Sequence, residues 1–281
     1  MAPAVADLPV VLDSLARWQE DWLPVQLHPG DLGWAWRAGA ESAAAAVRTW
    51  CRGGELLAVG LHDGPVLRLA IASHAGQDAE LADRLVSYVI DPGGPADVEV
   101  RFGDAVEAGL IAAGWTPGES WTPFTWDLGP PVPGPGMDVQ VVTAAEAPEC
   151  VAVHRAAFGS APGSVEPWHR MVTGPAWSGG TCLLARDAAG TAVAEAVVWS
   201  AGPGRPGLIE PMGVHPDHRG HGHGVAVTRA GAAALRAGGS SSVRVATPTA
   251  LTGAVATYAA AGLTRLDDVR DLRRPAPPTR R

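Results

Sequence analysis

The sequence predicts a mixed α/β fold arranged as two units in tandem, and three observations lead to this prediction. After residue 136, short β-rich runs alternate with helical segments. The densest run of proline and glycine, Gly129-Pro130-Pro131-Val132-Pro133-Gly134-Pro135-Gly136, cannot join a helix or a central strand and is typical of a domain boundary. Before this run, part of the same order of elements occurs once more. We therefore expect units at residues 1–129 and 137–275, a linker at 130–136 and a tail at 276–281.

Hydrophobic periodicity and turn residues predict the order βααβββαβαβ for the second unit. The predicted strands are 139–142, 181–186, 192–199, 208–214, 242–246 and a last strand from Leu263 onward. The predicted helices are 148–158, 166–172, 224–237 and 250–261. A turn at residues 187–190 makes a hairpin of the second and third strands, and Gly238-Gly239 ends the third helix.

The first unit shows a shorter version of this order. A hairpin of residues 56–61 and 66–72 around the turn 62–64 precedes a predicted helix at 78–90. A strand at 98–100, a helix ending at Ala113 and a final strand near 121–128 follow. The segments 98–115 and 243–263 share this strand–helix–glycine trace, which indicates a tandem duplication.

Composition restricts the function. The chain is 47% apolar and 18% charged, as in folded globular proteins. No apolar run is long enough for a membrane span, no secretion signal opens the sequence, and the three cysteines form no CxxC pair, so we expect a cytoplasmic protein with reduced thiols and no membrane partner. Every basic residue is an arginine, which excludes a Walker-type phosphate loop and Schiff-base chemistry.

Charge is distributed unevenly between the two halves. Residues 1–130 hold 18 acidic side chains against 7 arginines, whereas residues 131–281 hold 11 against 14. The basic second half can attract an anion such as a nucleotide cofactor. The acidic first half argues against a nucleic-acid partner and favours a cationic acceptor.

A glycine-rich loop lies between the predicted strand 208–214 and the helix after it, with the sequence Arg219-Gly220-His221-Gly222-His223-Gly224. Without Cβ atoms, successive backbone N–H groups can converge on an anion, and the helix N-terminus adds its free N–H groups and positive dipole end. The loop therefore predicts a pyrophosphate site. A dinucleotide fingerprint starting at Gly220 would need Gly or Ala where Val225 stands.

The spacing that matches is Arg-x-x-Gly-x-Gly, preceded by Val-x-Pro and followed by a helix with Ala and Tyr and then Gly-Leu (Arg219, Gly222, Gly224; Val214, Pro216; Ala254, Tyr258, Gly262, Leu263). This combination resembles the acetyl-coenzyme A signature of the GNAT superfamily and covers about half the chain. The resemblance implies a GNAT-like fold for each unit and an N-acetyltransferase that moves an acetyl group from acetyl-CoA directly to a primary amine of a small molecule or peptide. Because Leu110 stands where Tyr258 would in the first unit, and no such loop precedes it, the first unit is expected to have lost cofactor binding.

The resemblance also implies roles for single residues. The backbone of Met212, Gly213 and Val214 would pair with the pantetheine arm, and Tyr258 would be the general acid for the leaving thiolate. The pyrophosphate would be held at the loop by Arg219 and by the backbone amides of the residues after it (Gly220, His221, Gly222, His223, Gly224, Val225). One position departs from the family pattern, because Leu251 stands where many relatives have asparagine.

The expected general base is Glu210, with Glu195 as the second candidate. Strand alternation would place Glu210 on the same face as Met212 and Val214, and it resembles a glutamate found there in relatives. The alternatives are structural: for Glu210, a carboxylate that caps a nearby amide or pairs with an arginine, and for Tyr258, core packing.

Three further alternatives remain at the level of function. A non-catalytic acyl-CoA-binding or regulatory module would keep the loop and lose turnover. The loop histidines with Asp217 could chelate a metal, but we predict no metal site (His215, His218, His221, His223). The many tryptophans are expected to pack in the core and between the units rather than to line an acceptor pocket, and a homodimer is a further expectation.

Overall fold

The computed structural model describes residues 1–161 and 163–276, which form a mixed α/β structure around one twelve-stranded sheet. The strand order is β1-β2-β3-β4-β12-β5-β10-β9-β8-β7-β6, and the short β11 also pairs with β5. None of the helices in this described part combines the length and apolar character that crossing a bilayer requires. The predicted fold class is confirmed.

The N-terminal half builds one end of the sheet, and its helices are α1 (Leu8–Arg17), α2 (Pro29–Ala35), α3 (Ala40–Ala46), α4 (Ala79–Ile90) and α5 (Asp104–Ala112). Its strands are β1 (Val47–Arg52), β2 (Glu55–Asp63), β3 (Val66–Ile71), β4 (Asp97–Glu99) and β5 (Thr116–Asp127). Fully buried leucines of α1, α4, β3 and α5 meet in one apolar core (Leu15, Leu85, Leu67, Leu110).

The C-terminal half has helices on both sides of its strands, which are β6 (Asp138–Val141), β7 (Gly180–Arg186), β8 (Ala192–Trp199), β9 (Gly207–Val214), β10 (Ser242–Pro248), β11 (Thr264–Arg265) and β12 (Val269–Arg273). Side chains of α6 (Ala147–Ala157) and α7 (Glu166–Val172) pack in one core. Those of α8 (His223–Ala237) and α9 (Thr252–Ala261) pack in another.

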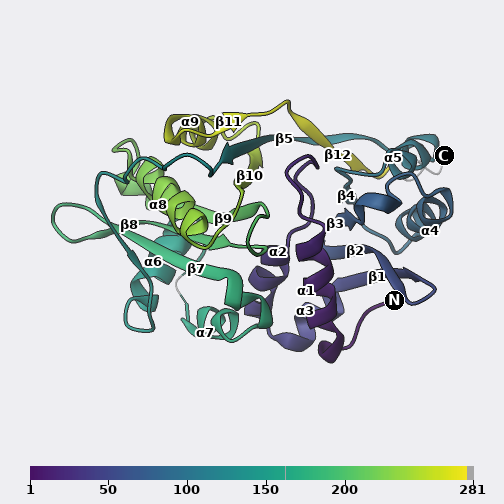
Figure 1. Cartoon of the computed structure of the whole chain (residues 1–281), viewed down its shortest axis with the longest axis horizontal. Coiled ribbons are helices and arrows are strands. Elements are labelled where there is room, and N and C mark those ends of the chain that lie inside the picture. Colours follow the sequence, from purple (N-terminus) through teal and green to yellow (C-terminus); the bar gives the residue numbers. More distant parts are fainter. Residues whose placement is uncertain (162, 277–281) are drawn as a thin grey trace.

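The two halves exchange their last strands. β12 lies between β4 and β5, where Leu272 is opposite Val98 of β4. In return, β5 pairs with β10 along seven residue pairs, from Ser242–Asp127 to Pro248–Trp121. Figure 1 shows the yellow β12 beside β4 and the teal β5 reaching toward β10. Each half therefore completes its part of the sheet with a strand that the other half supplies.

Helix α2 packs closely on the C-terminal half. A Cβ on Gly30 would lie 2.3 Å from Cγ of Trp199, and one on Gly33 would lie 2.4 Å from another atom of the same ring, so only glycines allow this approach. At the start of α2, the His28 ring accepts a hydrogen bond from Gly30 N (3.0 Å) and lies 3.3 Å from the carbonyl oxygen of Pro206.

Most predicted elements of the second unit agree with the structure within two residues. In the chain as a whole, three regions differ from the prediction. Helices α1 to α3 and strand β1 had not been predicted. Strand β5 begins at Thr116, five residues before the expected start, and the last strand is divided into β11 and β12. The predicted boundaries at 1–129, 130–136 and 137–275 stay predictions, and the predicted tail falls, beyond Ala276, outside the described residues.

Candidate active site

Strands β9 and β10 separate after a short parallel contact, and this opening defines the site. They pair only at Gly207–Val243 and Leu208–Arg244. Beyond these pairs, β9 continues to Val214 and bonds to β8 on its other side, with Glu195 opposite Gly213. The edge of β9 from Ile209 to Val214 therefore has no strand partner in β10. Such an edge offers backbone N–H and C=O groups to an extended ligand.

A bulge in β9 places Glu210 differently from the simple alternation. Between the pairs Ala196–Met212 and Val198–Ile209, β9 has one more residue than β8. As a result, Ile209 and not Glu210 packs with Met212 and Val214 against the α8 side, so the expected shared face is wrong. The Trp199 indole N–H donates to the backbone oxygen of Glu210 (2.8 Å) and so ties the bulge to β8.

The glycine loop has the backbone that an anion site at a helix start requires. Gly222 precedes α8 with φ of +83°, a left-handed conformation that favours glycine, and nothing lies within 4 Å of a Cβ built there. Gly224 has a packing reason instead, because its Cβ would lie 2.9 Å from Cγ2 of Thr257 in α9. The first turn of α8, up to Val225, has backbone N–H groups without partners inside the helix, and they begin beside the open space at Gly222.

Arg219 bonds the loop to neighbouring elements, and two of the loop histidines stack on each other. The Arg219 guanidinium donates to the carbonyl oxygens of Ala157 (3.0 Å) and Val214 (3.3 Å), at the ends of α6 and β9. The rings of His221 and His223 stack with centroids 5.9 Å apart, and partial burial with the neighbouring imidazoles lowers the pKa of His223. Among the described residues, no three His, Cys, Asp or Glu side chains are grouped to hold a metal ion.

Tyr258 lies in the core between α9 and the sheet, only 5% exposed, with its ring centroid 5.6 Å from that of Phe124. Burial raises its pKa, and the negative charges of Glu210 and Glu195 raise it further. The phenol is therefore protonated at neutral pH and able to donate a proton. Its position suits both the predicted acid and the alternative of core packing.

Glu210 contacts a buried charge network from the N-terminal half. Its Oε1 lies 3.3 Å from Nη1 of Arg68 in β3, and the same guanidinium contacts Asp31 (2.7 Å) and Glu99 (3.2 Å). Burial raises the pKa of Asp31 to about 7, while the Arg68 charge opposes this shift. The Glu210 side chain is 38% exposed, so it remains accessible from the opening.

Sequence reasoning had not identified Arg68, Asp31 or Glu99. Arg68 and Glu210 are 142 positions apart, and no local pattern joins them. The one signal available was a charged residue inside the apolar run Val66-Leu67-Arg68-Leu69-Ala70-Ile71, since a buried charge needs a partner.

A cavity of ≈ 150 Å³ between the halves has Glu210 in its wall. A second cavity, of ≈ 180 Å³, is lined by Glu195, which is 2% exposed and lies 3.0 Å from Nδ1 of His154. Burial raises the pKa of Glu195, and His154 opposes the shift. Of the two candidate bases, only Glu210 combines an exposed carboxylate with the Arg68 contact.

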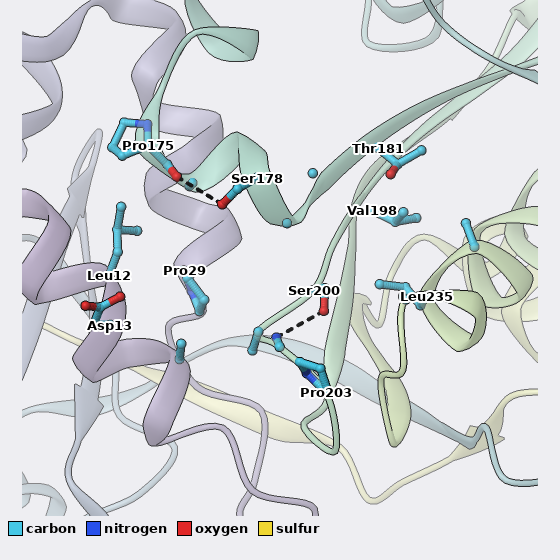
Figure 2. Close-up of a pocket in the computed structure, with 18 residues that line it drawn as sticks. Leu12, Asp13, Pro29, Pro175, Ser178, Thr181, Val198, Ser200, Pro203 and Leu235 are labelled. Carbon is cyan, nitrogen blue, oxygen red and sulfur yellow. Dashed lines mark hydrogen bonds between the residues drawn. The ribbon is translucent and has the colours of Figure 1, made fainter.

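A larger cavity lies elsewhere and is not the predicted site. Figure 2 shows this space of ≈ 450 Å³, with Leu12, Asp13 and Pro29 on one side and Thr181, Val198 and Leu235 on the other. It contains neither the glycine loop nor either candidate catalytic residue. Its wall holds a single charged side chain, Asp13, so it lacks the groups that acid–base chemistry needs.

Comparisons with known proteins relate the C-terminal half to one family and the whole chain to one fold. Residues 153–263 match the model of the acetyltransferase (GNAT) family. A GNAT-family acetyltransferase from Colwellia psychrerythraea has a TM-score of 0.60 at 15% identity, over 96% of both chains. A GCN5-related N-acetyltransferase from Sphaerobacter thermophilus has a TM-score of 0.56 at 20% identity, over 97% of this chain and 94% of that one.

A tandem GNAT protein from the clavulanic acid biosynthesis pathway has a TM-score of 0.55 at 19% identity, over 99% of this chain and 96% of that one. At these identities the structural likeness shows the fold, and it extends over both halves. No curated protein has a significantly similar sequence. Residues 153–263, which match the GNAT acetyltransferase family, contain the glycine loop, Glu210 and Tyr258, and the chain as a whole has the fold of a tandem GNAT protein.

Proposed function

We propose that this protein transfers an acetyl group from acetyl-CoA directly to a primary amine of a small molecule or peptide. The observation that carries the proposal is the open edge of β9. It leads from the glycine loop after Val214, at one end, to Glu210 and its cavity at the other. Members of this family typically use an acyl-CoA, so the donor would lie along this edge.

The residues present fit such a donor. An extended pantetheine arm would add to the sheet through the backbone of Met212, Gly213 and Val214. The pyrophosphate would take N–H groups at the open start of α8, from Gly220 to Val225, in the positive field of the helix N-terminus. Arg219 would hold the loop in place through its bonds to Ala157 and Val214. The bound thioester supplies the acyl group.

In the proposed reaction, the amine nitrogen bonds to the acyl carbon and the carbon–sulfur bond breaks. Glu210 accepts the proton that the amine loses, and Arg68 holds the carboxylate toward the cavity. Tyr258 donates a proton to the departing sulfur, which the protonated state of its buried phenol allows. Both reactants are held together, so no acyl-enzyme is needed.

The second candidate function is the non-catalytic acyl-CoA-binding module. Leu251 favours it, because this residue precedes α9 with an exposed apolar side chain that makes no capping hydrogen bond. It therefore supplies none of the polar contact that asparagine would. Acetylation of an amine by the purified protein is expected of the enzyme and not of the binding module, and it separates the two functions.

The test is calorimetric titration of acetyl-CoA combined with an assay of amine acetylation. The variant His221→Glu/His223→Glu places negative charge at the loop without altering a glycine, and it is expected to lose at least about tenfold in affinity. Ala108→Glu/Ala112→Glu, on the exposed side of α5, adds the same charge away from the loop and should bind normally.

Glu210→Gln is expected to bind acetyl-CoA normally and to lose roughly 100-fold in kcat. Failure of the folded wild type to bind acetyl-CoA would contradict the proposal. Full turnover by Glu210→Gln would contradict the choice of base and lead to Glu195→Gln. Binding without turnover of any amine would favour the non-catalytic module.

A further inference from the structure

The cavity beside Glu210 is built by both halves of the chain. Its walls come from β2, β3, β4, β5, β9, β10 and β12 and from Pro24 and Val25 before α2. A volume of ≈ 150 Å³ holds about five water-sized groups, the size of a short aliphatic chain. Apolar atoms of Val66, Leu208 and the Trp121 ring supply part of the lining.

Charge in this lining is strongly one-sided. Two guanidiniums, of Arg68 and Arg101, face five carboxylates (Asp63, Glu99, Glu119, Glu210, Asp271). Both guanidiniums are already paired. Arg68 contacts Asp31, Glu99 and Glu210, and Arg101 lies 2.7 Å from Asp271 and 3.9 Å from Glu99. An acceptor with a carboxylate or phosphate would have to displace one of these pairs, at the cost of leaving a buried acid unpaired.

Two of the five carboxylates are free of such pairs. Asp63, at the end of β2, and Glu119, in β5, are exposed and form no ion pair with any described residue. Trp121 lies two residues from Glu119 and is fixed in the wall by its N–H bond to Asp271 (3.0 Å). Free carboxylates beside an aromatic ring are groups that bind an alkyl ammonium.

We infer that the cavity between the halves accepts an aliphatic amine with a second positive charge, such as a short diamine, whose far ammonium binds Asp63 and Glu119 while the reacting amine lies at Glu210. This inference rests on the proposed acetyl transfer and narrows its acceptor. The N-terminal half, which has no glycine loop of its own, thereby determines which substrate the C-terminal half uses.

The test compares three acceptors of equal chain length: putrescine with an ammonium at its far end, n-butylamine with a methyl group there, and γ-aminobutyrate with a carboxylate. Steady-state kcat/KM is expected to be about tenfold higher for putrescine than for n-butylamine, and lowest for γ-aminobutyrate. The preference for putrescine should shrink as ionic strength rises, because salt screens exposed charges.

The variant Asp63→Asn/Glu119→Gln should abolish the preference, so that kcat/KM becomes equal for putrescine and n-butylamine. Its matched control, Asp83→Asn/Glu107→Gln, removes the same two charges from exposed positions of α4 and α5 outside the cavity. The control should keep the full preference.

Equal rates for putrescine and n-butylamine would overturn the inference and leave acetyl transfer intact. Titration of putrescine into the protein with coenzyme A covers the case without turnover. Binding that Asp63→Asn/Glu119→Gln abolishes, without acetylation of any of the three amines, would contradict the proposed reaction and support the cation site. Absence of putrescine binding would overturn the cation site.

Discussion

At the scale of single residues, the buried side chain of His28 makes the stability of the protein depend on pH. Its ring is fully buried, with Nδ1 accepting from Gly30 N and the other nitrogen at the Pro206 oxygen, so it is neutral with the proton on Nε2. Burial lowers its pKa to about 3. The folded protein therefore excludes a proton that the unfolded chain binds below about pH 6.5.

This difference predicts a loss of stability in mild acid. Because the folded-state pKa is lowered, the contribution of His28 is present above the unfolded pKa and disappears as the pH falls below it. His28→Asn keeps a capping acceptor and removes the titration. Between pH 7 and pH 5, the free energy of unfolding of this variant should therefore fall by about 2 kcal/mol less than that of the wild type. Denaturant unfolding at both pH values measures this, and equal losses would contradict it.

Tyr258→Phe separates chemistry from packing. No described residue bonds to the Tyr258 hydroxyl, so its removal should change the free energy of unfolding by less than about 1 kcal/mol. If the phenol is the acid, kcat falls about 100-fold while the affinity for acetyl-CoA is kept. A variant with wild-type kcat would leave Tyr258 as a core residue only.

Most of the candidate residues that the sequence predicted lie within one local segment. Glu210 and the glycine loop lie within 15 positions of one another, at a strand end and a helix start where spacing carries information. Arg68 and Asp31 reach Glu210 only through the contact between halves, which no spacing encodes. The face of Glu210 was predicted wrongly because a bulge interrupts alternation.

At the scale of elements, the start of α8 depends on backbone conformation. Gly222→Ala meets no neighbour but must hold φ at +83°, which costs roughly 1 kcal/mol, and it should weaken acetyl-CoA binding by altering the loop. Gly253→Ala, in the first turn of α9 with equally open surroundings, should stabilise the protein by about 0.5–1 kcal/mol and bind normally. Thermal unfolding and calorimetry report both effects, and equal behaviour of the two variants would contradict the role given to Gly222.

The elements that sequence predicted best have strong periodicity and clear turns, as in the β7–β8 hairpin around residues 187–190. Helix α2 was missed for a physical reason. Seven residues with two glycines have little helix propensity, and their helix is stabilised by packing on Trp199. Helix α3 was missed because most of its residues are alanine, so its buried and exposed faces do not differ in hydrophobicity and no amphipathic period is visible.

At the scale of the whole molecule, strand exchange predicts a single unfolding transition. Because β5 and β12 join both halves, neither half can lose its sheet without exposing an edge of the other. Calorimetry should give one peak with equal calorimetric and van't Hoff enthalpies. Leu69→Ala, in the N-terminal core, should destabilise the protein by about 2–5 kcal/mol and so move the whole peak to a lower temperature. A separate transition of the C-terminal half at the wild-type temperature would contradict the coupling.

The exchange itself was not predictable from sequence. A strand pattern indicates that a segment is extended and which residues face a core, but not which edge it joins. The sequence predicted a strand at the end of each unit, and the exchange of these strands follows from contacts between residues such as Leu272 and Val98.

The exchange has a consequence for biosynthesis. Arg101, just after β4, and Asp271 of β12 are 170 positions apart, so the ribosome needs roughly 10 to 30 s to deliver the strand that covers β4. During this interval the N-terminal half has a complete set of helices and an uncovered sheet edge. Such an edge pairs readily with other chains, and the nascent protein is therefore expected to depend on chaperones until β12 has emerged.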